Sequence, residues 1–130
     1  KGFVYGGGLG LAGDAYAEFA NVANTEVHIN GGYVVNTVFG GGENGHVMGN
    51  TEITMESGLI GQRNTLAEFV TDQSEQGAHI YTGSILGGGR GTDTDNNGHY
   101  SQVTGIVKGD SKVTVSGGVV RNSVFGAGGL

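Results

Sequence analysis

The chain has 130 residues, of which 29 are glycine, and it contains neither proline nor cysteine. Its net charge at pH 7 is −6 and its six basic residues are scattered, so it lacks the basic stripe that nucleic acids or anionic membranes require. The absence of cysteine excludes a disulfide framework, and no apolar run is long enough to cross a bilayer. Without proline, the chain can turn often and still keep its backbone donors for hydrogen-bonded ladders.

A glycine block ends each of four similar segments. The first copy runs from Val4 to Gly8, a β-branched and an aromatic residue followed by three glycines, and it returns in one phase along the chain. Such recurrence is typical of a repeat architecture. We expect the first apolar residue of each block to point into the core; these residues are Val4, Val38, Ile85 and Val124.

A first insertion, Leu11 to Asn21, follows the first glycine block. Asp14 precedes an alanine-rich stretch there, which predicts a turn or two of helix capped by the aspartate. Such helices could cover an open side of the fold, and the alternative is a recognition loop held by a rigid scaffold.

A block with the alternation of a half-buried strand spans Asn24 to Val34 and recurs without gaps at Asn50 to Ile60 and Asp110 to Val120. In each copy the apolar residues stand two apart, and Gly-Gly or Ser-Gly predicts a corner after them. Stacking of the copies would place the polar residues between them in an outer ladder. Its members would be Glu26 and His28, Glu52 and Thr54, and Lys112 and Thr114.

An asparagine follows the corner of each copy, at Asn36, Asn64 and Asn122. Asparagine tolerates left-handed backbone and can bond its own backbone, so we interpret these residues as bends rather than ligands. Asn64 belongs to this set because residues 63–66 resemble residues 121–124. The second insertion, Ala67 to Ser84, follows, and it again carries Ala-Glu-Phe before it becomes polar.

One unit is thus a strand, a glycine corner, a short strand, an asparagine bend, another short strand and a triple glycine, with a return of variable length. Constant blocks with variable returns are typical of a β-solenoid, in which each coil stacks on the one before. We therefore predict an all-β fold, a right-handed parallel β-helix of about three to four coils with loop insertions; the handedness follows the general preference of parallel crossovers. Residues 1–130 would form a single segment of a longer array.

The third insertion, Thr92 to Gln102, has the strongest chemical pattern. Asp93, Asp95 and Asn97 match the first half of a calcium loop, in which oxygens two residues apart converge on the ion. The bidentate glutamate that completes such a loop is replaced by Thr104. The sequence predicts a weak Ca²⁺ site at these three residues, and the alternative is a solvated acidic loop.

No strong catalytic signature accompanies this loop. Two acids on one glycine-rich turn beside Arg90 are a poor arrangement for acid and base catalysis. The glycine blocks are not phosphate loops, since no Lys-Ser or Lys-Thr follows them. The histidines lack ligand spacing; they are His28, His46, His79 and His99. We expect no enzymatic activity, with a polysaccharide lyase or hydrolase as the alternative.

Residues 38–58 read Val-Phe-Gly-Gly-Gly-Glu-Asn-Gly-His-Val-Met-Gly-Asn-Thr-Glu-Ile-Thr-Met-Glu-Ser-Gly. This pattern resembles the glycine-rich repeats of very large bacterial cell-surface and secreted proteins, which are similar in design to β-helical adhesins and autotransporter passenger domains. The resemblance implies an extracellular or surface-bound structural protein that displays loops or adheres to surfaces and polymers such as glycans. No catalytic residues carry over. The alternative is a β-helix that binds or cleaves polysaccharides and has a calcium-binding loop.

Uncapped solenoid ends expose backbone donors and acceptors. We therefore expect the partners to include neighbouring repeats or further copies of the chain, stacked along the axis into fibres.

Calcium binding by the third insertion is tested by titration. If Asp93 and Asp95 hold the ion, calorimetry should give a saturable heat, and calcium should raise the melting temperature because it binds the folded state. A variant carrying both Asp93→Asn and Asp95→Asn should lose both effects. No heat and no melting shift at millimolar calcium would contradict the site.

Overall fold

A computed structural model describes residues 2–10, 20–61, 83–91 and 104–128 of the chain. The strands within these ranges are β1 (Val4–Tyr5), β2 (Thr25–Val34), β3 (Val38–Phe39), β4 (Thr51–Ile60), β5 (Ile85–Leu86), β6 (Ser111–Val115), β7 (Val119–Val120) and β8 (Val124–Phe125). No helix in these ranges is long and apolar enough to cross a membrane. The short helices predicted in the first two insertions fall on residues 11–19 and 62–82, outside the described ranges.

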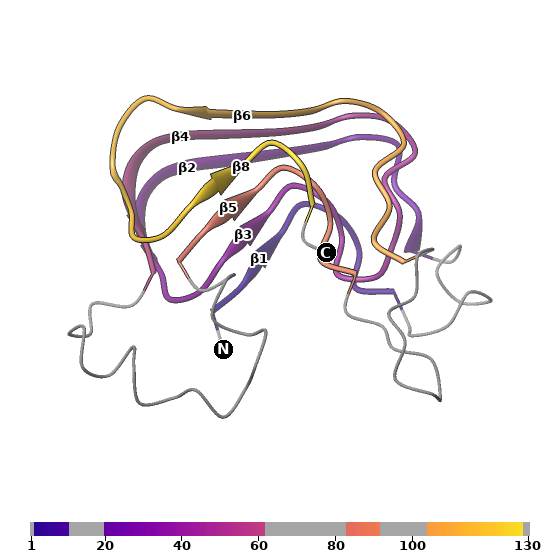
Figure 1. Cartoon of the computed structure of the whole chain (residues 1–130), viewed down its shortest axis with the longest axis horizontal. Coiled ribbons are helices and arrows are strands. Elements are labelled where there is room, and N and C mark those ends of the chain that lie inside the picture. Colours follow the sequence, from indigo (N-terminus) through magenta and orange to yellow (C-terminus); the bar gives the residue numbers. More distant parts are fainter. Residues whose placement is uncertain (1, 11–19, 62–82, 92–103, 129–130) are drawn as a thin grey trace.

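The strands form two sheets with parallel pairing throughout. The short-strand sheet has the order β1-β3-β5-β8, and the long-strand sheet has the order β2-β4-β6, with β7 also paired to β4. Figure 1 shows strands of one sheet lying side by side, opposite those of the other. The predicted all-β character with parallel strands is therefore confirmed for the described part of the chain.

Equivalent residues of successive repeats pair with one another. We assign β1 and β2 to the first repeat, β3 and β4 to the second, β5 to β7 to the third, and β8 to the fourth. The predicted alignment of the long strands is confirmed at their start, where Thr25 pairs with Thr51 and Thr51 with Ser111. It shifts where Asn30 pairs with Ser57, at an irregularity just before the glycine corner.

The outer ladder predicted for the long strands is also confirmed. Glu26 pairs with Glu52 and Glu52 with Lys112, and the neighbouring rank holds His28, Thr54 and Thr114. These side chains alternate with the apolar ones that face the opposite sheet, as the two-residue period requires.

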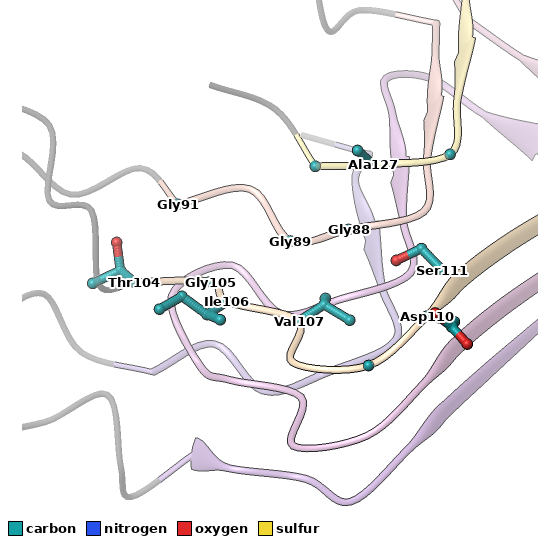
Figure 2. A pocket seen from close by; sticks show the side chains of 13 residues that line it. Gly88, Gly89, Gly91, Thr104, Gly105, Ile106, Val107, Asp110, Ser111 and Ala127 are labelled. Carbon is teal, nitrogen blue, oxygen red and sulfur yellow. The ribbon is translucent and has the colours of Figure 1, made fainter.

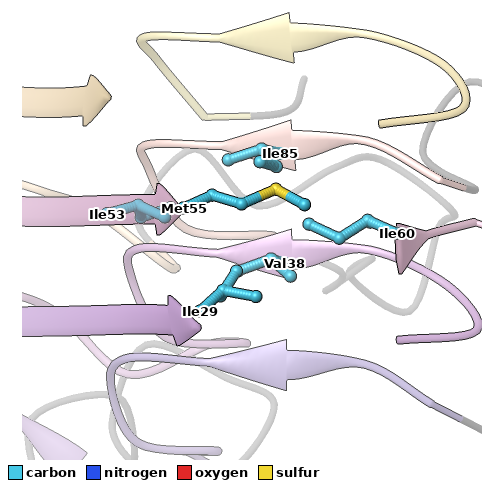
Figure 3. Close-up of a cluster of buried hydrophobic side chains, with 6 residues drawn as sticks. All are labelled: Ile29, Val38, Ile53, Met55, Ile60 and Ile85. Atoms are coloured by element: carbon cyan, nitrogen blue, oxygen red, sulfur yellow. The ribbon is translucent and has the colours of Figure 1, made fainter. Parts of the chain in front are cut away.

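The core lies between the two sheets. Figure 3 shows its buried cluster, to which both sheets contribute: Ile29, Ile53, Met55 and Ile60 from the long strands, and Val38 and Ile85 from the short ones. The predicted inward residues Val38 and Ile85 are fully buried, and Val4 is half-buried against this cluster. Val124 pairs in register with Ile85 and so lies in the predicted inward rank, but it is 47% exposed because no described long strand covers it.

The triple glycines are required by the close approach of backbone to backbone. A Cβ on Gly41 would lie 2.6 Å from the Gly89 nitrogen of the next repeat, and one on Gly40 would clash with the Gly87 carbonyl oxygen. Neither Gly40 nor Gly41 has a positive φ. The blocks therefore mark the places where consecutive repeats come closest, and any side chain there would push them apart.

The corners of the long strands use glycine for a different reason. Gly32, Gly58 and Gly118 have φ values of +82°, +109° and +86°, which side-chain-bearing residues rarely adopt. Strands β2 and β4 run through the corner, with their pairing interrupted between Asn30 and Tyr33, whereas in the third repeat the corner separates β6 from β7.

The predicted bends at Asn36 and Asn122 are confirmed, but their backbones are not left-handed. Asn36 and Asn122 lie at bends, but no described residue other than glycine has a positive φ. Their backbones are held by neighbouring repeats: Asn36 N–H donates to Gly2 O at 2.9 Å, and Asn122 N–H donates to Gly83 O at 3.0 Å. Asn64 lies outside the described residues.

The third repeat re-enters the stack at Gly83, before the end that the sequence predicts for the second insertion. Gly83 occupies the rank between Asn36 and Asn122, and Ser84 lies fully buried beneath Ser123. The insertion thus ends before Gly83 and not at Ser84. Its two ends meet where Gly61 and Gly83 pack backbone against backbone with φ values of +108° and +81°, a conformation that glycine adopts without steric cost.

A pair of glycine substitutions tests the close approach. Gly40→Ala should destabilise the fold by about 1–3 kcal/mol because the new methyl group overpacks against the next repeat. Gly126→Ala, at the same rank of the fourth repeat, should change stability by less than about 0.5 kcal/mol, since nothing lies within 4 Å of its Cβ position. Urea unfolding measures both, and equal losses would contradict the stacking.

Candidate functional site

The predicted calcium ligands Asp93, Asp95 and Asn97 lie outside the described residues, but the two ends of their insertion are fixed. Gly91 N–H donates to the Glu43 carbonyl oxygen at 2.7 Å. On the return, Gly105 N–H donates to the Asn44 carbonyl oxygen at 2.8 Å. Both anchors belong to the second repeat, so the chain leaves and rejoins the stack at one corner.

The first insertion departs from this same corner. The preceding residues are bound to the second repeat, because Glu43 N–H donates to Gly8 O at 3.2 Å and Asn44 N–H donates to Leu9 O at 2.9 Å. The second repeat itself makes the corner without an insertion, between Gly42 and Gly45. Two insertions therefore arise from one edge of the stack, on either side of a short turn.

Arg90 forms a clasp across three repeats at this edge. Its guanidinium donates to a Glu43 carboxylate oxygen at 2.9 Å and to the Tyr5 hydroxyl oxygen at 3.1 Å. It also lies 4.8 Å from the centre of the Phe3 ring, within the range of a cation–π contact. The Arg90 and Glu43 side chains are only 31% and 20% exposed, so their attraction is less screened than that of a surface pair.

An aromatic cluster supports the clasp. The Tyr5 and Phe39 rings stack at 5.2 Å between centroids, and Phe3 lies against both. Burial raises the pKa of the Tyr5 hydroxyl above its usual value, while the hydrogen bond and charge of Arg90 act in the opposite direction. Tyr5 is therefore neutral at pH 7, and its hydroxyl oxygen accepts the hydrogen bond from Arg90.

Charged residues on the outer ladder form exposed pairs. Lys112 Nζ lies 2.9 Å from a Glu52 carboxylate oxygen, and this contact lowers the pKa of Glu52 and raises that of Lys112. His28 lies 2.6 Å from Glu26. Both pairs are exposed to solvent, so their attraction is screened and each contributes little to stability.

A hollow of about 420 Å³ opens at the end of the stack formed by the third and fourth repeats. Figure 2 shows that Asp110 and Ser111 lie towards one end of it and Thr104 towards the other. Seven of the thirteen lining residues are glycine; the lining residues are Gly88, Gly89, Gly91, Thr104, Gly105, Ile106, Val107, Gly109, Asp110, Ser111, Gly126, Ala127 and Gly128. The Thr104 hydroxyl is buried and has no hydrogen-bond partner in the described structure.

Within the described ranges no three His, Asp or Glu side chains come together as a metal site would require. Arg90, which the sequence places beside the acidic loop, is held by Glu43 and Tyr5. His46 accepts a hydrogen bond from Ile106 N–H at 3.3 Å, and His79 and His99 lie outside the described residues.

Sequence reasoning missed the clasp and the hollow. The clasp joins residues that are far apart in the chain, and the only signal for it is that Glu43 and Arg90 follow the glycine block at the same position in consecutive repeats. The hollow lies beside the last described strand of the long-strand sheet, so predicting it requires the order of the strands and not only their positions in the sequence.

Comparison with family models, curated proteins and solved structures gives no match to this chain.

The clasp predicts opposite shifts in the ionisation of Tyr5. Arg90→Met should raise the pKa of Tyr5 further, because it removes the hydrogen bond and charge that favour the phenolate. Glu43→Gln should lower the same pKa, because it removes a nearby negative charge. An NMR titration of the tyrosine ring carbons measures both, and shifts of the same sign would contradict the geometry.

The raised pKa also has a consequence for stability. The folded state binds the Tyr5 proton more tightly than the unfolded state, so this contribution is complete below the ordinary value of 10.0 and is lost as pH rises through the folded pKa. The unfolding free energy of the wild type should therefore fall more steeply with alkaline pH than that of Tyr5→Phe. Parallel curves for the two proteins would contradict the assignment.

Proposed function

We propose that the chain is a non-catalytic segment of a right-handed parallel β-solenoid, which serves as a structural and adhesive part of a bacterial extracellular or surface protein. The observation that carries this proposal is the in-register pairing of equivalent residues in successive repeats. Val4, Val38, Ile85 and Val124 pair in sequence along one sheet. A coil that stacks on its predecessor produces such ranks.

A third rank of backbone contacts supports the coiled arrangement. Val22 bridges to Val47 and Val47 to Val107, both in parallel orientation, and these residues belong to neither sheet. In each of the first three repeats the chain passes the short-strand sheet, this bridge and the long-strand sheet in the same order. Three ranks visited in a constant order are what a three-sided coil would give.

The arrangement of the insertions supports a display role. The first and third insertions leave from one corner, and their ends are hydrogen-bonded to the second repeat. A rigid scaffold that presents two neighbouring loops is a common basis for recognition. We therefore assign adhesion to glycans or other surface polymers to these loops, while the stacked strands supply rigidity.

A loop-shortening variant tests this division of roles. Residues 91–104 are replaced by one asparagine, so that Gly89-Arg90-Asn-Gly105 copies the short turn from Gly42 to Gly45 in the second repeat. The variant should keep its circular dichroism spectrum and melt within a few degrees of the wild type, because the second repeat already tolerates this corner. It should lose binding to insoluble polysaccharides and bacterial cell walls that retain the wild type.

The same samples separate adhesion from catalysis. Wild-type protein incubated with acidic polysaccharides should release no new reducing ends and no unsaturated products. Release of either would favour the polysaccharide-cleaving alternative. Undiminished binding by the shortened variant would contradict the role of the third insertion, and its failure to fold would contradict the scaffold.

A further inference from the structure

The charged pair of the clasp lies at the corner from which the first and third insertions leave the stack. Glu43 and Arg90 hold equivalent positions in the second and third repeats, directly after the glycine block. The backbone fixes both of them. Glu43 N–H donates to Gly8 O at 3.2 Å, and Arg90 N–H donates to Gly42 O at 3.0 Å. The two side chains therefore start from a rigid corner between the roots of two insertions.

The exposure of this pair does not come from an end of the stack. The second repeat, which holds Glu43, lies between the first and the third, and the third repeat, which holds Arg90, is followed by β8 of the fourth. The Arg90 side chain is 31% exposed and the Glu43 side chain 20% exposed. Because each has a repeat on either side, a ligand reaches them from the flank of the stack.

The ion pair uses one nitrogen and one oxygen. Nη1 of Arg90 makes both of the hydrogen bonds, to Glu43 Oε1 and to the Tyr5 hydroxyl. A fork-to-fork pair would use two nitrogens and two oxygens. Among the described residues, Nη2 and Nε of Arg90 and Oε2 of Glu43 therefore have no such bond. The clasp keeps an unused donor edge beside an unused acceptor.

The aromatic residues hold the guanidinium in one orientation. The Phe3 ring lies 4.8 Å from it, and the Tyr5 hydroxyl accepts its hydrogen bond at 3.1 Å. Tyr5 is itself stacked on the fully buried Phe39. An arginine fixed in this way loses little side-chain freedom when a ligand binds, so less of the binding free energy is spent on ordering it.

The charges indicate which ligand the clasp can take. An anion that approached Arg90 would also meet the Glu43 carboxylate and a chain of net charge −6, and a cation would meet the guanidinium. A hydroxyl group both accepts and donates hydrogen bonds, so it suits a donor edge beside an acceptor. Phe3 and Tyr5 are half-buried and offer apolar surface next to these polar groups. A neutral sugar ring combines neighbouring hydroxyls with apolar C–H groups.

We propose that Arg90 and Glu43 form a binding subsite for a neutral sugar. Ring hydroxyls accept hydrogen bonds from Nη2 and Nε of Arg90 and donate to Oε2 of Glu43, while C–H groups of the ring contact Phe3 and Tyr5. The inference rests on the adhesive role proposed above, and it narrows the polymer bound there to a neutral glycan that crosses the corner between the two insertions.

Binding is tested by NMR with the isotope-labelled full chain and the neutral methyl glycosides of mannose, glucose and galactose. The Arg90 Nε–H signal should shift saturably with at least one of them, at millimolar concentrations because a single sugar makes few contacts. The signal of the exposed Arg121 is the internal control and should not move. Glucuronate should bind more weakly than the neutral glycosides. No saturable shift with any neutral glycoside, or tighter binding of glucuronate, would overturn the proposal.

Substitutions separate a binding role of the clasp from a purely structural one. Arg90→Met should weaken glycoside affinity at least about tenfold, because it removes both donors. Arg90→Lys should weaken it as well, because an ammonium keeps the charge but lacks the planar donor edge. Arg121→Met is the matched control and should bind as the wild type does. The backbone signals of Glu43 and Gly91 report binding in all three variants.

The melting temperature of each variant shows whether its fold is retained. Wild-type affinity in a folded Arg90→Lys variant would contradict the donor edge. Wild-type affinity in a folded Arg90→Met variant would leave the clasp with a structural role alone and overturn the subsite.

The loop-shortened variant distinguishes failure of the subsite from failure of the adhesive role. It retains Arg90 and Glu43, so it should keep the glycoside-induced shift at Glu43 while it loses retention on insoluble polysaccharides. Retention of the wild type on polysaccharides without any glycoside shift would overturn the subsite and leave adhesion to the insertions. A glycoside shift in a chain that no polysaccharide retains would support the subsite and contradict the adhesive role.

Discussion

The contact between consecutive triple-glycine corners is the constraint on which the rest of the structure depends. At Gly40 and Gly87 the backbones of neighbouring repeats are so close that no side chain fits between them. The long strands are tied to these corners, since the Thr25 hydroxyl donates to Gly40 O at 2.5 Å and the Thr51 hydroxyl to Gly87 O at 2.6 Å. The close approach therefore sets the spacing of both sheets, and the pairing of every rank follows from it.

This constraint explains why the insertions between strands can vary in length while the strands and glycine blocks cannot. A residue added within the glycine block or the long strand would shift its rank by one position and turn apolar side chains outward. A residue added between Gly91 and Thr104 shifts nothing, because both ends are held by backbone bonds to the second repeat. Loop closure costs free energy that grows only slowly with length, so insertions of different sizes are tolerated at these corners.

The long strands could be predicted from sequence because their inward ranks keep the residue type: a hydroxyl at Thr25, Thr51 and Ser111, and an apolar residue two positions later. The point at which the third repeat returns to the short-strand sheet could not be predicted from sequence. Residues 63–66 resemble the asparagine-bend motif, but Gly83 and Ser84 occupy the place of that motif in the stack. Local likeness does not reveal where a chain re-enters a ladder. The Arg90 clasp could not be predicted either, because a long side chain that reaches two repeats back produces no periodic pattern in the sequence.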